Sequence, residues 1–271
     1  MKRILLNKII YDIQDTDAQN SFIRDCETAV SHRLFKYSEG SYPFSDSLYI
    51  SDTHEKCALF KEYGYPVAAL SHKNNTGQDF DGLRYIIIDP ELISLEDYDN
   101  IYRRLCGLPL DILKTERIFI RESTIEDLDS FYELYDDPEV KLFMEPLFEP
   151  EKEKEYQLSY IENIYRLYDI GMWTLINNED DHILGRAGIE YVDAPGTVEL
   201  GFMIGAPYRR KGYAFEACMA IINYARSIEG INRIRTRVRK DNTASQNLCK
   251  KLMFLPVKEL DNDLIEWELM I

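Results

Sequence analysis

Three consecutive cations and a glycine stand where a predicted strand turns into a predicted helix. Arg209, Arg210 and Lys211 are followed directly by Gly212. The first N–H groups of a helix have no intrahelical partner, and the helix dipole adds partial positive charge there. A glycine at the junction lets the backbone approach a ligand closely. These residue types in this order predict a binding site for an anion such as a phosphate.

The residues on either side have the periodicities that such a site needs. Apolar residues alternate over a predicted strand at residues 197–204, and Pro207 ends it. Helical spacing over residues 213–228 places small and apolar residues on one face: Ala214, Ala217, Cys218, Ile221, Ala225 and Ile228. If only the loop is considered, an alternative to the anion site is an ordinary strand–helix connection whose three cations are solvated.

The longer pattern resembles a known family. A strand, then R-x-x-G-x-A at residues 209–214, then a helix rich in small residues is similar to the acetyl-CoA pyrophosphate loop of the GNAT N-acetyltransferases. The resemblance is closest to the branch that acetylates the N-termini of ribosomal proteins. It extends from about Thr115 to Ile271 and does not cover the first 110 residues. It implies an α/β fold in which helices flank a mixed, mostly antiparallel, splayed sheet, and it implies acetyl-CoA as the acetyl donor. The resemblance assigns to the cofactor Phe202, Met203, Ile204, Arg209, Arg210, Lys211, Gly212, Tyr213, Ala214 and Asn242.

A second stretch matches the family in part. Residues 242–245, NTAS, open a predicted helix that runs to Lys251, and Phe254 follows. The pattern N-x-x-S-x-x-x-Y-x-K-x-G-F is common in the superfamily, but Cys249 stands here at the tyrosine position and Met253 at the glycine position. The tyrosine is the usual general acid, so its replacement puts that role in doubt. The alternative is a non-catalytic regulatory protein that binds acetyl-CoA without turnover.

Acetyl transfer to an amine requires the neutral amine, so a base or a water chain must take a proton. The resemblance assigns Glu199, acting through water, to that step, and the alternative is an exposed strand charge. It assigns Ser245 to the leaving sulfur, and the alternative is an ordinary residue in the first turn of a helix. Backbone N–H groups around Met203 would then stabilise the oxyanion. Glu199 and Ser245 are therefore the predicted catalytic residues.

Residues 1–110 predict a separate, small Rossmann-like α/β domain of uncertain role. The predicted helices cover residues 17–35, 55–63 and 95–106, and the predicted strands cover residues 47–51, 66–71 and 84–89. The last strand is a continuous apolar run that suits a buried parallel strand. Residues 47–70 loosely resemble the core of haloacid-dehalogenase-like domains, whose first strand ends in D-x-D. The corresponding run here is Asp52-Thr53-His54, so we assign no chemistry and expect Asp52 to cap the next helix.

Glycine and proline near residues 108–115 place a domain boundary there, so that residues 111–271 form the acetyltransferase domain. Further strands are predicted at residues 117–122, 173–177, 183–192 and 233–239, with two more after Phe254. A predicted helix over residues 150–170 places four side chains on one face: Tyr156, Tyr160, Ile164 and Leu167. These side chains are either part of the core or, as the resemblance implies, lie next to the acceptor. Alternation over residues 233–239 places on one strand face Arg233, Arg235, Arg237 and Arg239. This arginine face is either solvated or contributes one or two cations to the cofactor phosphates.

Charge narrows the class of partner. The net charge of −16 argues against a nucleic-acid partner. Residues 207–240 contain nine Lys/Arg against two Asp/Glu, a local charge of +7, whereas residues 112–206 contain eight against 22, a local charge of −14. A basic side and an acidic side would suit a polyanionic cofactor and a cationic amine acceptor. A merely patchy surface is the alternative.

The remaining composition predicts a cytoplasmic protein. No run approaches ~18 consecutive apolar residues, so no membrane span is expected, and the N-terminus lacks the features of a signal peptide. Five scattered cysteines without a CxxC pair indicate reduced thiols. These cysteines and the four scattered histidines give no metal-ligand spacing, and the sequence leaves the oligomeric state open.

Overall fold

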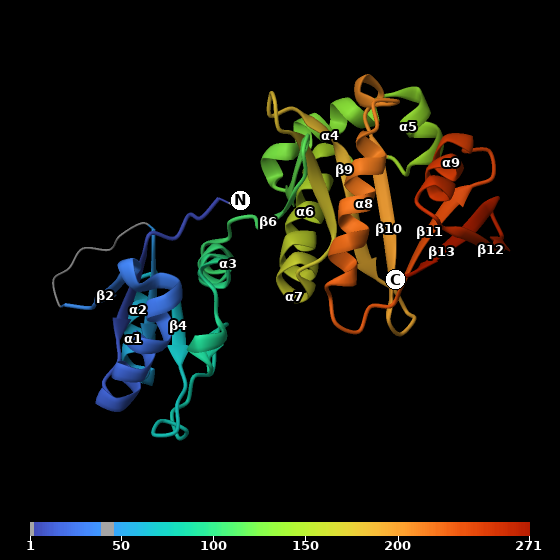
Figure 1. Ribbon diagram of the computed structural model, residues 1–271. Coiled ribbons are helices and arrows are strands. Elements are labelled where there is room, and N and C mark those ends of the chain that lie inside the picture. Colours follow the sequence, from blue (N-terminus) through green and yellow to red (C-terminus); the bar gives the residue numbers. More distant parts are fainter. Residues whose placement is uncertain (1–2, 39–45) are drawn as a thin grey trace. The chain divides into compact units, whose positions relative to one another are not determined.

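The computed structural model describes residues 3–38 and 46–271, which form two compact units that meet in sequence between Leu110 and Asp111 (Figure 1). Within the described residues, no helix has the length and apolar character needed to cross a lipid bilayer.

The N-terminal unit is built on five parallel strands in the order β2-β1-β3-β4-β5. The strands are β1 Lys8–Asp12, β2 Leu34–Lys36, β3 Ser47–Ser51, β4 Val67–Leu70 and β5 Ile86–Ile87. The helices are α1 Thr16–Val30, α2 His54–Glu62 and α3 Leu95–Cys106, with 3-10 turns η1 Ser31–Arg33 and η2 Pro90–Leu92.

Helices cover both faces of this sheet, which explains why its central strands are apolar at successive positions. On one face Ile9 and Leu48 share a buried cluster with Phe22 of α1 and with α3. On the other face Tyr49 packs near Phe60 of α2, with ring centroids 5.1 Å apart. The prediction of a small parallel α/β unit is therefore confirmed.

Two predictions for this unit are wrong in detail, and strand β1 was missed. The first helix ends at Val30 and not near residue 35, because the chain turns at η1 and pairs its next residues with β1 as strand β2. The apolar run at residues 84–89 contributes only a two-residue edge strand, in which Ile86 is 47% exposed, and Ile88 just beyond it is 67% exposed. Strand β1, in which Lys8 and Asp12 flank the apolar residues, was not predicted at all.

The C-terminal unit is built on an eight-stranded sheet in the order β12-β13-β11-β10-β9-β8-β7-β6. Its strands are β6 Asp111–Lys114, β7 Ile118–Glu122, β8 Met172–Asn177, β9 Ile183–Tyr191, β10 Thr197–Ile204, β11 Arg233–Arg239, β12 Leu255–Leu260 and β13 Leu264–Met270. Its helices are α4 Leu128–Tyr135, α5 Pro138–Phe143, α6 Pro150–Tyr160, α7 Arg166–Tyr168, α8 Tyr213–Arg226 and α9 Thr243–Lys251. Shorter turns are η3 Ile125–Asp127, the π-helical η4 Ile161–Tyr165, and η5 Ala206–Tyr208.

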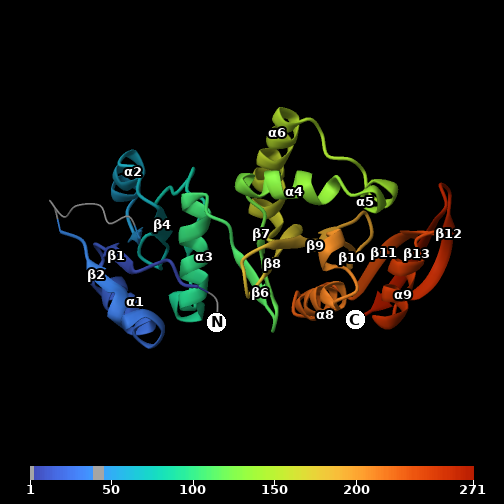
Figure 2. The same ribbon diagram turned by 90° about the horizontal axis from the view of Figure 1, so that it is seen from above.

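The two faces of this sheet have different covers. Figure 2 shows α8 and α9 on one face and α4, α5 and α6 on the opposite face. Trp173 of β8 contacts Tyr224 of α8, with ring centroids 5.6 Å apart, and so identifies the α8 face. Arg186 of β9 lies over the ring of Phe131 of α4, at 4.6 Å, and so identifies the α6 face. The predicted mixed, mostly antiparallel sheet with flanking helices is confirmed.

The predicted helix at residues 150–170 is interrupted by the π-helical turn η4, which changes which side chains face the sheet. Tyr160 and Tyr165 are buried, whereas Tyr156 is 47% exposed and Leu167 is 68% exposed. The interpretation of the predicted face as core therefore fails for Tyr156 and Leu167. For Leu167, which follows η4, the reason is that a regular helical period does not continue through the π-helical turn.

Candidate active site

Strands β10 and β11 run parallel and stop pairing after three residues. Residues 197–199 pair with residues 233–235. Beyond that point β10 continues beside β9 as far as Ile204, and β11 continues beside β13 as far as Arg239. Within the part of the chain that the structure describes, residues 200–204 thus have no strand partner on the β11 side. The amides predicted to bind the oxyanion, around Met203, lie on this segment.

The basic loop leads from β10 and η5 into α8. Arg210 and Gly212 both have positive φ, at 59° and 88°, which turns the chain sharply into the helix. The first amides of α8, from Tyr213 to Phe215, have no intrahelical partner, and the N-cap residue Gly212 has no side chain to accept a hydrogen bond from them. A Cβ on Gly212 would lie 3.3 Å from Nη2 of Arg117. The loop therefore has the uncapped helix N-terminus that suits an anion.

The three loop cations are not equivalent. Arg209 donates to Asp137 at 2.9 Å and also to Glu139, so it joins the loop to the start of α5. Arg210 and Lys211 are exposed, and no carboxylate of residues 3–38 or 46–271 pairs with either of them. Of the cations assigned to the cofactor, these two are the ones that an anion can reach without displacing an ion pair.

Arg117, directly before β7, holds the basic loop in place through its side chain. The sequence did not indicate this role. Its Nη1 donates to the carbonyl oxygen of Lys211 at 2.9 Å, and its Nη2 lies 2.6 Å from the carboxylate of Glu216 in the first turn of α8. The guanidinium also lies 4.6 Å from the ring centroid of Tyr213. The hydroxyl of Thr115 donates to the same Glu216 carboxylate at 2.6 Å. These contacts fix the direction in which α8 begins.

Glu199 belongs to a ladder of ion pairs on the α6 face of the sheet. Its Oε2 lies 2.8 Å from Arg235 and 3.8 Å from Arg237 on β11. The same two arginines lie 3.9 Å and 3.3 Å from Glu266 on β13. The predicted arginine face is therefore neither simply solvated nor free for phosphates at these positions. Glu199 keeps a half-buried carboxylate at the last pair before β10 and β11 separate.

Asn242 and Ser245 lie at the same edge of the sheet as the basic loop. Because β10 and β11 are parallel, the segments that follow them leave from the same side. Asn242 is the N-cap of α9, and its Oδ1 accepts the N–H of Ser245 at 3.0 Å. Figures 1 and 2 both show α8 and α9 as neighbours on one face. The fold thus brings together two stretches that the sequence separates by about thirty residues.

The two departures from the family pattern have different structural outcomes. Cys249 is 1% exposed, and burial raises the pKa of its thiol to about 12. Its side chain is thus in the interior, where it does not replace an accessible tyrosine hydroxyl. Met253 adopts a φ of 68°, which explains why a glycine suits this position, and its side chain is 74% exposed.

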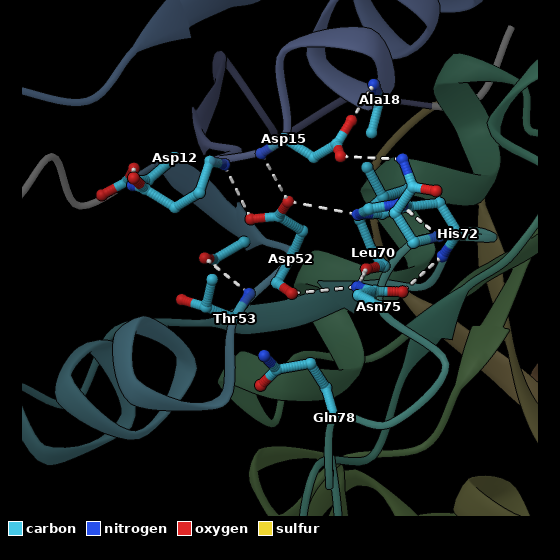
Figure 3. A network of polar contacts seen from close by, with 12 residues as sticks. Asp12, Asp15, Ala18, Asp52, Thr53, Leu70, His72, Asn75 and Gln78 are labelled. Atoms are coloured by element: carbon cyan, nitrogen blue, oxygen red, sulfur yellow. Dashed lines mark hydrogen bonds and ion pairs between the residues drawn. The ribbon is translucent and has the colours of Figure 1, made fainter.

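In the N-terminal unit, Asp52 does not cap the helix that follows it. Thr53 is the N-cap of α2, and its side chain accepts the N–H of Lys56. The Asp52 carboxylate instead accepts the N–H groups of Gln14 at 2.8 Å and Asp15 at 3.1 Å and lies 3.1 Å from Nε2 of His72 (Figure 3). The cap interpretation is wrong because Thr53 caps α2, whereas the Asp52 carboxylate accepts backbone N–H groups of the loop after β1. Among the described residues, no group of three or more histidine, cysteine, aspartate or glutamate side chains is arranged to hold a metal ion.

The chain matches known proteins over the C-terminal unit. A family model for the acetyltransferase (GNAT) domain covers residues 117–254, about half of the chain. The uncharacterized N-acetyltransferase p20 of Bacillus licheniformis is 28% identical over 148 residues, which is 54% of this chain and 83% of the relative.

Two solved structures have the same fold at low sequence identity. The ribosomal-protein-S5-alanine acetyltransferase of Vibrio fischeri has a TM-score of 0.52 and 15% identity, and the match covers 58% of this chain and 95% of that one. The spermidine N-acetyltransferase of Vibrio cholerae, in complex with CoA and spermine, has a TM-score of 0.51 and 14% identity, with 58% and 96% covered. Together with the separating parallel strands and the uncapped loop helix, these matches show that the chain belongs to the GNAT family of N-acetyltransferases.

Proposed function

We propose that this protein transfers the acetyl group of acetyl-CoA to a primary amine of a cationic acceptor, with a basic peptide N-terminus as the first candidate. The observation that carries the proposal is the uncapped N-terminus of α8. It follows Arg210 and Lys211, which are exposed and form no ion pair with the described residues, at the edge where β10 and β11 separate.

The residues present at this edge fit the cofactor. A pyrophosphate needs N–H donors and positive charge, which the first amides of α8, Arg210 and Lys211 supply. Residues 202–204 offer backbone groups to an extended ligand alongside β10, because β11 has turned away. When bound, acetyl-CoA supplies the thioester that the amine attacks. Asn242 stands at the second helix N-terminus on the same edge.

The family resemblance and the positions of the side chains support three chemical roles. Glu199, whose carboxylate lies 2.8 Å from Arg235, takes the proton of the attacking amine through water. Amides around Met203 donate to the oxyanion. The hydroxyl of Ser245 donates to the departing sulfur, a role that the buried thiol of Cys249 does not fill.

The acceptor is proposed to be cationic because the acidic segment, residues 112–206 with a local charge of −14, includes the helices on the α6 face. Such a field attracts amines and raises their association rate at low salt. The two structural neighbours are named for a ribosomal protein and for spermidine, both amine acceptors. An α-amino group, with a pKa near ~7.7–8.0, is neutral far more often at pH 7 than a lysine side chain near ~10.4.

The test is release of coenzyme A with a basic peptide, an acidic peptide and spermidine, each at low and high salt. We expect the cationic acceptors to react best and to lose that advantage in salt, since charges are screened beyond about 8 Å at physiological ionic strength. Preference for the acidic peptide would contradict the electrostatic proposal. Calorimetric binding of acetyl-CoA without release of coenzyme A to any amine would instead support non-catalytic binding.

The compartment that we propose is the cytoplasm. All five cysteines are free thiols in the structure, and four of them are buried. Free cysteines suit a reducing compartment, because oxidising compartments favour disulfides.

A further inference from the structure

A pocket of about 530 Å³ lies in the C-terminal unit between the α6–η4–α7 segment and the end of β9. Its walls include four tyrosines, Tyr156, Tyr160, Tyr168 and Tyr191, and one carboxylate, Glu190. Its volume is within the range of small-ligand sites, about 300–1,000 Å³. The rings of Tyr168 and Tyr191 are 5.7 Å apart between centroids, and both side chains are about half exposed at the rim. The faces of tyrosine rings attract cations.

Glu190 is a partly buried carboxylate without a cation. The hydroxyl of Tyr160 donates to it, and that hydroxyl in turn accepts the N–H of Met172 at 2.8 Å. Among the described residues, no lysine or arginine lies within ion-pair distance of Glu190. Arg186, on the same face of β9, is instead placed over the ring of Phe131. A partly buried carboxylate without a countercharge is stabilised by a cationic ligand, so such a ligand would be favourable here.

The contrast with Glu199 is direct, because the two residues are opposite each other in the register of β9 and β10. Paired residues of antiparallel strands share a face and have Cβ atoms about 4.5–5.5 Å apart. Glu199 is neutralised by Arg235, with Arg237 nearby, whereas Glu190 is not. The pair at Glu199 is also the last one before β10 and β11 separate. The anionic end of the pocket is therefore one strand away from the predicted reacting centre, on the α6 face.

Tyr160 remains a neutral donor to Glu190. Burial, followed by the neighbouring Glu190 charge, raises the pKa of Tyr160 far above its ordinary value. The hydroxyl therefore keeps its proton throughout the neutral range, and it orients the carboxylate without neutralising it.

We propose that this pocket binds the acceptor, and that Glu190 holds a positive charge of the acceptor other than the amine that reacts. The reacting amine must be neutral to attack a thioester, so the charge that Glu190 neutralises belongs to a second cationic centre. This narrows the proposed function to acceptors with at least two amino or guanidino groups. A polyamine and a peptide with a basic residue next to its N-terminus share that chemistry. The inference depends on the proposed transfer reaction for its catalytic consequence but not for binding.

The first test compares a diamine with a monoamine of matched length, 1,5-diaminopentane against hexylamine, in wild type and in Glu190→Gln. The variant keeps the size of the side chain and an acceptor for Tyr160. We expect wild type to have at least a tenfold lower KM for the diamine than for hexylamine, and we expect Glu190→Gln to remove most of that preference while the affinity for acetyl-CoA stays the same. Glu162→Gln is the control, because Glu162 is a carboxylate of η4 that pairs with Arg166 outside the pocket walls. An unchanged preference in Glu190→Gln overturns the proposal.

The second test measures binding without turnover. Calorimetry uses three ligands: spermidine, a Lys-containing peptide, and an otherwise identical peptide that lacks the lysine. The comparison shows whether a polyamine or a basic peptide supplies the second positive charge. Weaker spermidine binding in Glu190→Gln, by about tenfold, together with weaker binding in Tyr168→Leu, supports the pocket even if no amine is acetylated. In that case the proposed transfer fails and the pocket remains. Equal binding by wild type and both variants, with unchanged thermal unfolding, rejects the pocket.

Discussion

Both units of the chain have polar groups beyond the end of a parallel strand, yet they use those groups differently. In the N-terminal unit, Asp52 follows β3, and its two carboxylate oxygens are taken by the N–H groups of Gln14 and Asp15 and by His72 (Figure 3). Asp12, at the end of β1, lies 3.3 Å from Lys56. In the C-terminal unit, β10 leads into a helix whose first amides have no intrahelical partner.

The difference shows that strand ends in a parallel sheet are not ligand sites by position alone. Buried polar groups are nearly always paired, so a site is found where the chain itself leaves donors or acceptors unused. The polar groups around Asp52 stabilise the loops of their own unit. The amides of α8, the exposed Arg210 and Lys211, and the Glu190 carboxylate are the groups that remain for ligands.

The largest effect that we expect comes from Glu199→Gln, which keeps size and polarity but removes the proposed base. Turnover should fall about 100-fold, the lower end of general-base contributions, while affinity for acetyl-CoA is unchanged. Glu266→Gln is the matched control, because Glu266 pairs with the same two arginines from β13. Equal losses in the two variants would assign Glu199 to the ion-pair ladder and not to proton transfer.

Asp52→Asn tests whether the polar network of the N-terminal unit is structural. A hydrogen-bonded charge that is 3% exposed is removed, so the free energy of unfolding of the N-terminal unit should fall by about 2 kcal/mol. Hydrogen exchange in urea measures the two units separately. Asp25→Asn is the control, since its partner Arg24 is largely exposed and the pair contributes little. A loss of acetyl-CoA affinity in Asp52→Asn would contradict the view that this network is only structural.

Gly212→Asp places a side chain and a negative charge at the loop and should weaken acetyl-CoA binding at least tenfold, about 1.4 kcal/mol. The control is Gly230→Asp. Gly230 has a φ of 86°, close to the 88° of Gly212, and a Cβ there meets no atom within 4 Å. Backbone strain is thus matched. Unchanged calorimetric affinity in Gly212→Asp would remove the loop from the cofactor site.

The smallest effect concerns Glu216, which holds the start of α8. Burial acts to raise its pKa, but hydrogen bonds from Thr115 and Arg117 outweigh it, so the pKa is lowered in the folded state. A lowered folded pKa contributes stability above the unfolded value, and that contribution is lost as pH falls through the folded value. Glu216→Gln should therefore cost about 1 kcal/mol at pH 7, and the cost should shrink as the pH falls below the pKa of an unfolded glutamate. A gap in unfolding free energy that persists in acid would show that the charge is not the cause.

Local features of the fold and the candidate site were predictable because neighbouring residues determine them. Gly212 before a helix of small residues indicated the loop, and Asn242 indicated a cap, which the structure has at α9. Gly107, in the left-handed conformation with a φ of 69°, ends α3 where the sequence indicated. The mixed, mostly antiparallel sheet followed from a family resemblance and not from periodicity alone, and its edge strand β6, Asp111–Lys114, was not predicted because that stretch was interpreted as a domain boundary.

The remaining features depend on partners that are distant in sequence. Nothing near Arg117 indicates that it will meet Glu216, and nothing near Asp52 indicates the amides of Gln14 and Asp15. The π-helical turn η4 also escapes a pattern based on the regular helical period. The Tyr160–Glu190 contact, which joins α6 to β9, therefore required the structure.

The parallel pairing of β10 with β11 in the C-terminal unit also has a consequence for the order of folding. Strands β8, β9 and β10 are consecutive antiparallel neighbours, so they close through short loops. Strand β11 pairs with β10 only after the chain has crossed over through α8, which carries a larger loop-closure cost. The edge proposed to bind acetyl-CoA is therefore completed late, by the docking of β11, α9, β12 and β13. A ligand bound there would shift the equilibrium toward the docked state, and its removal should speed amide exchange first in this last-formed part of the sheet.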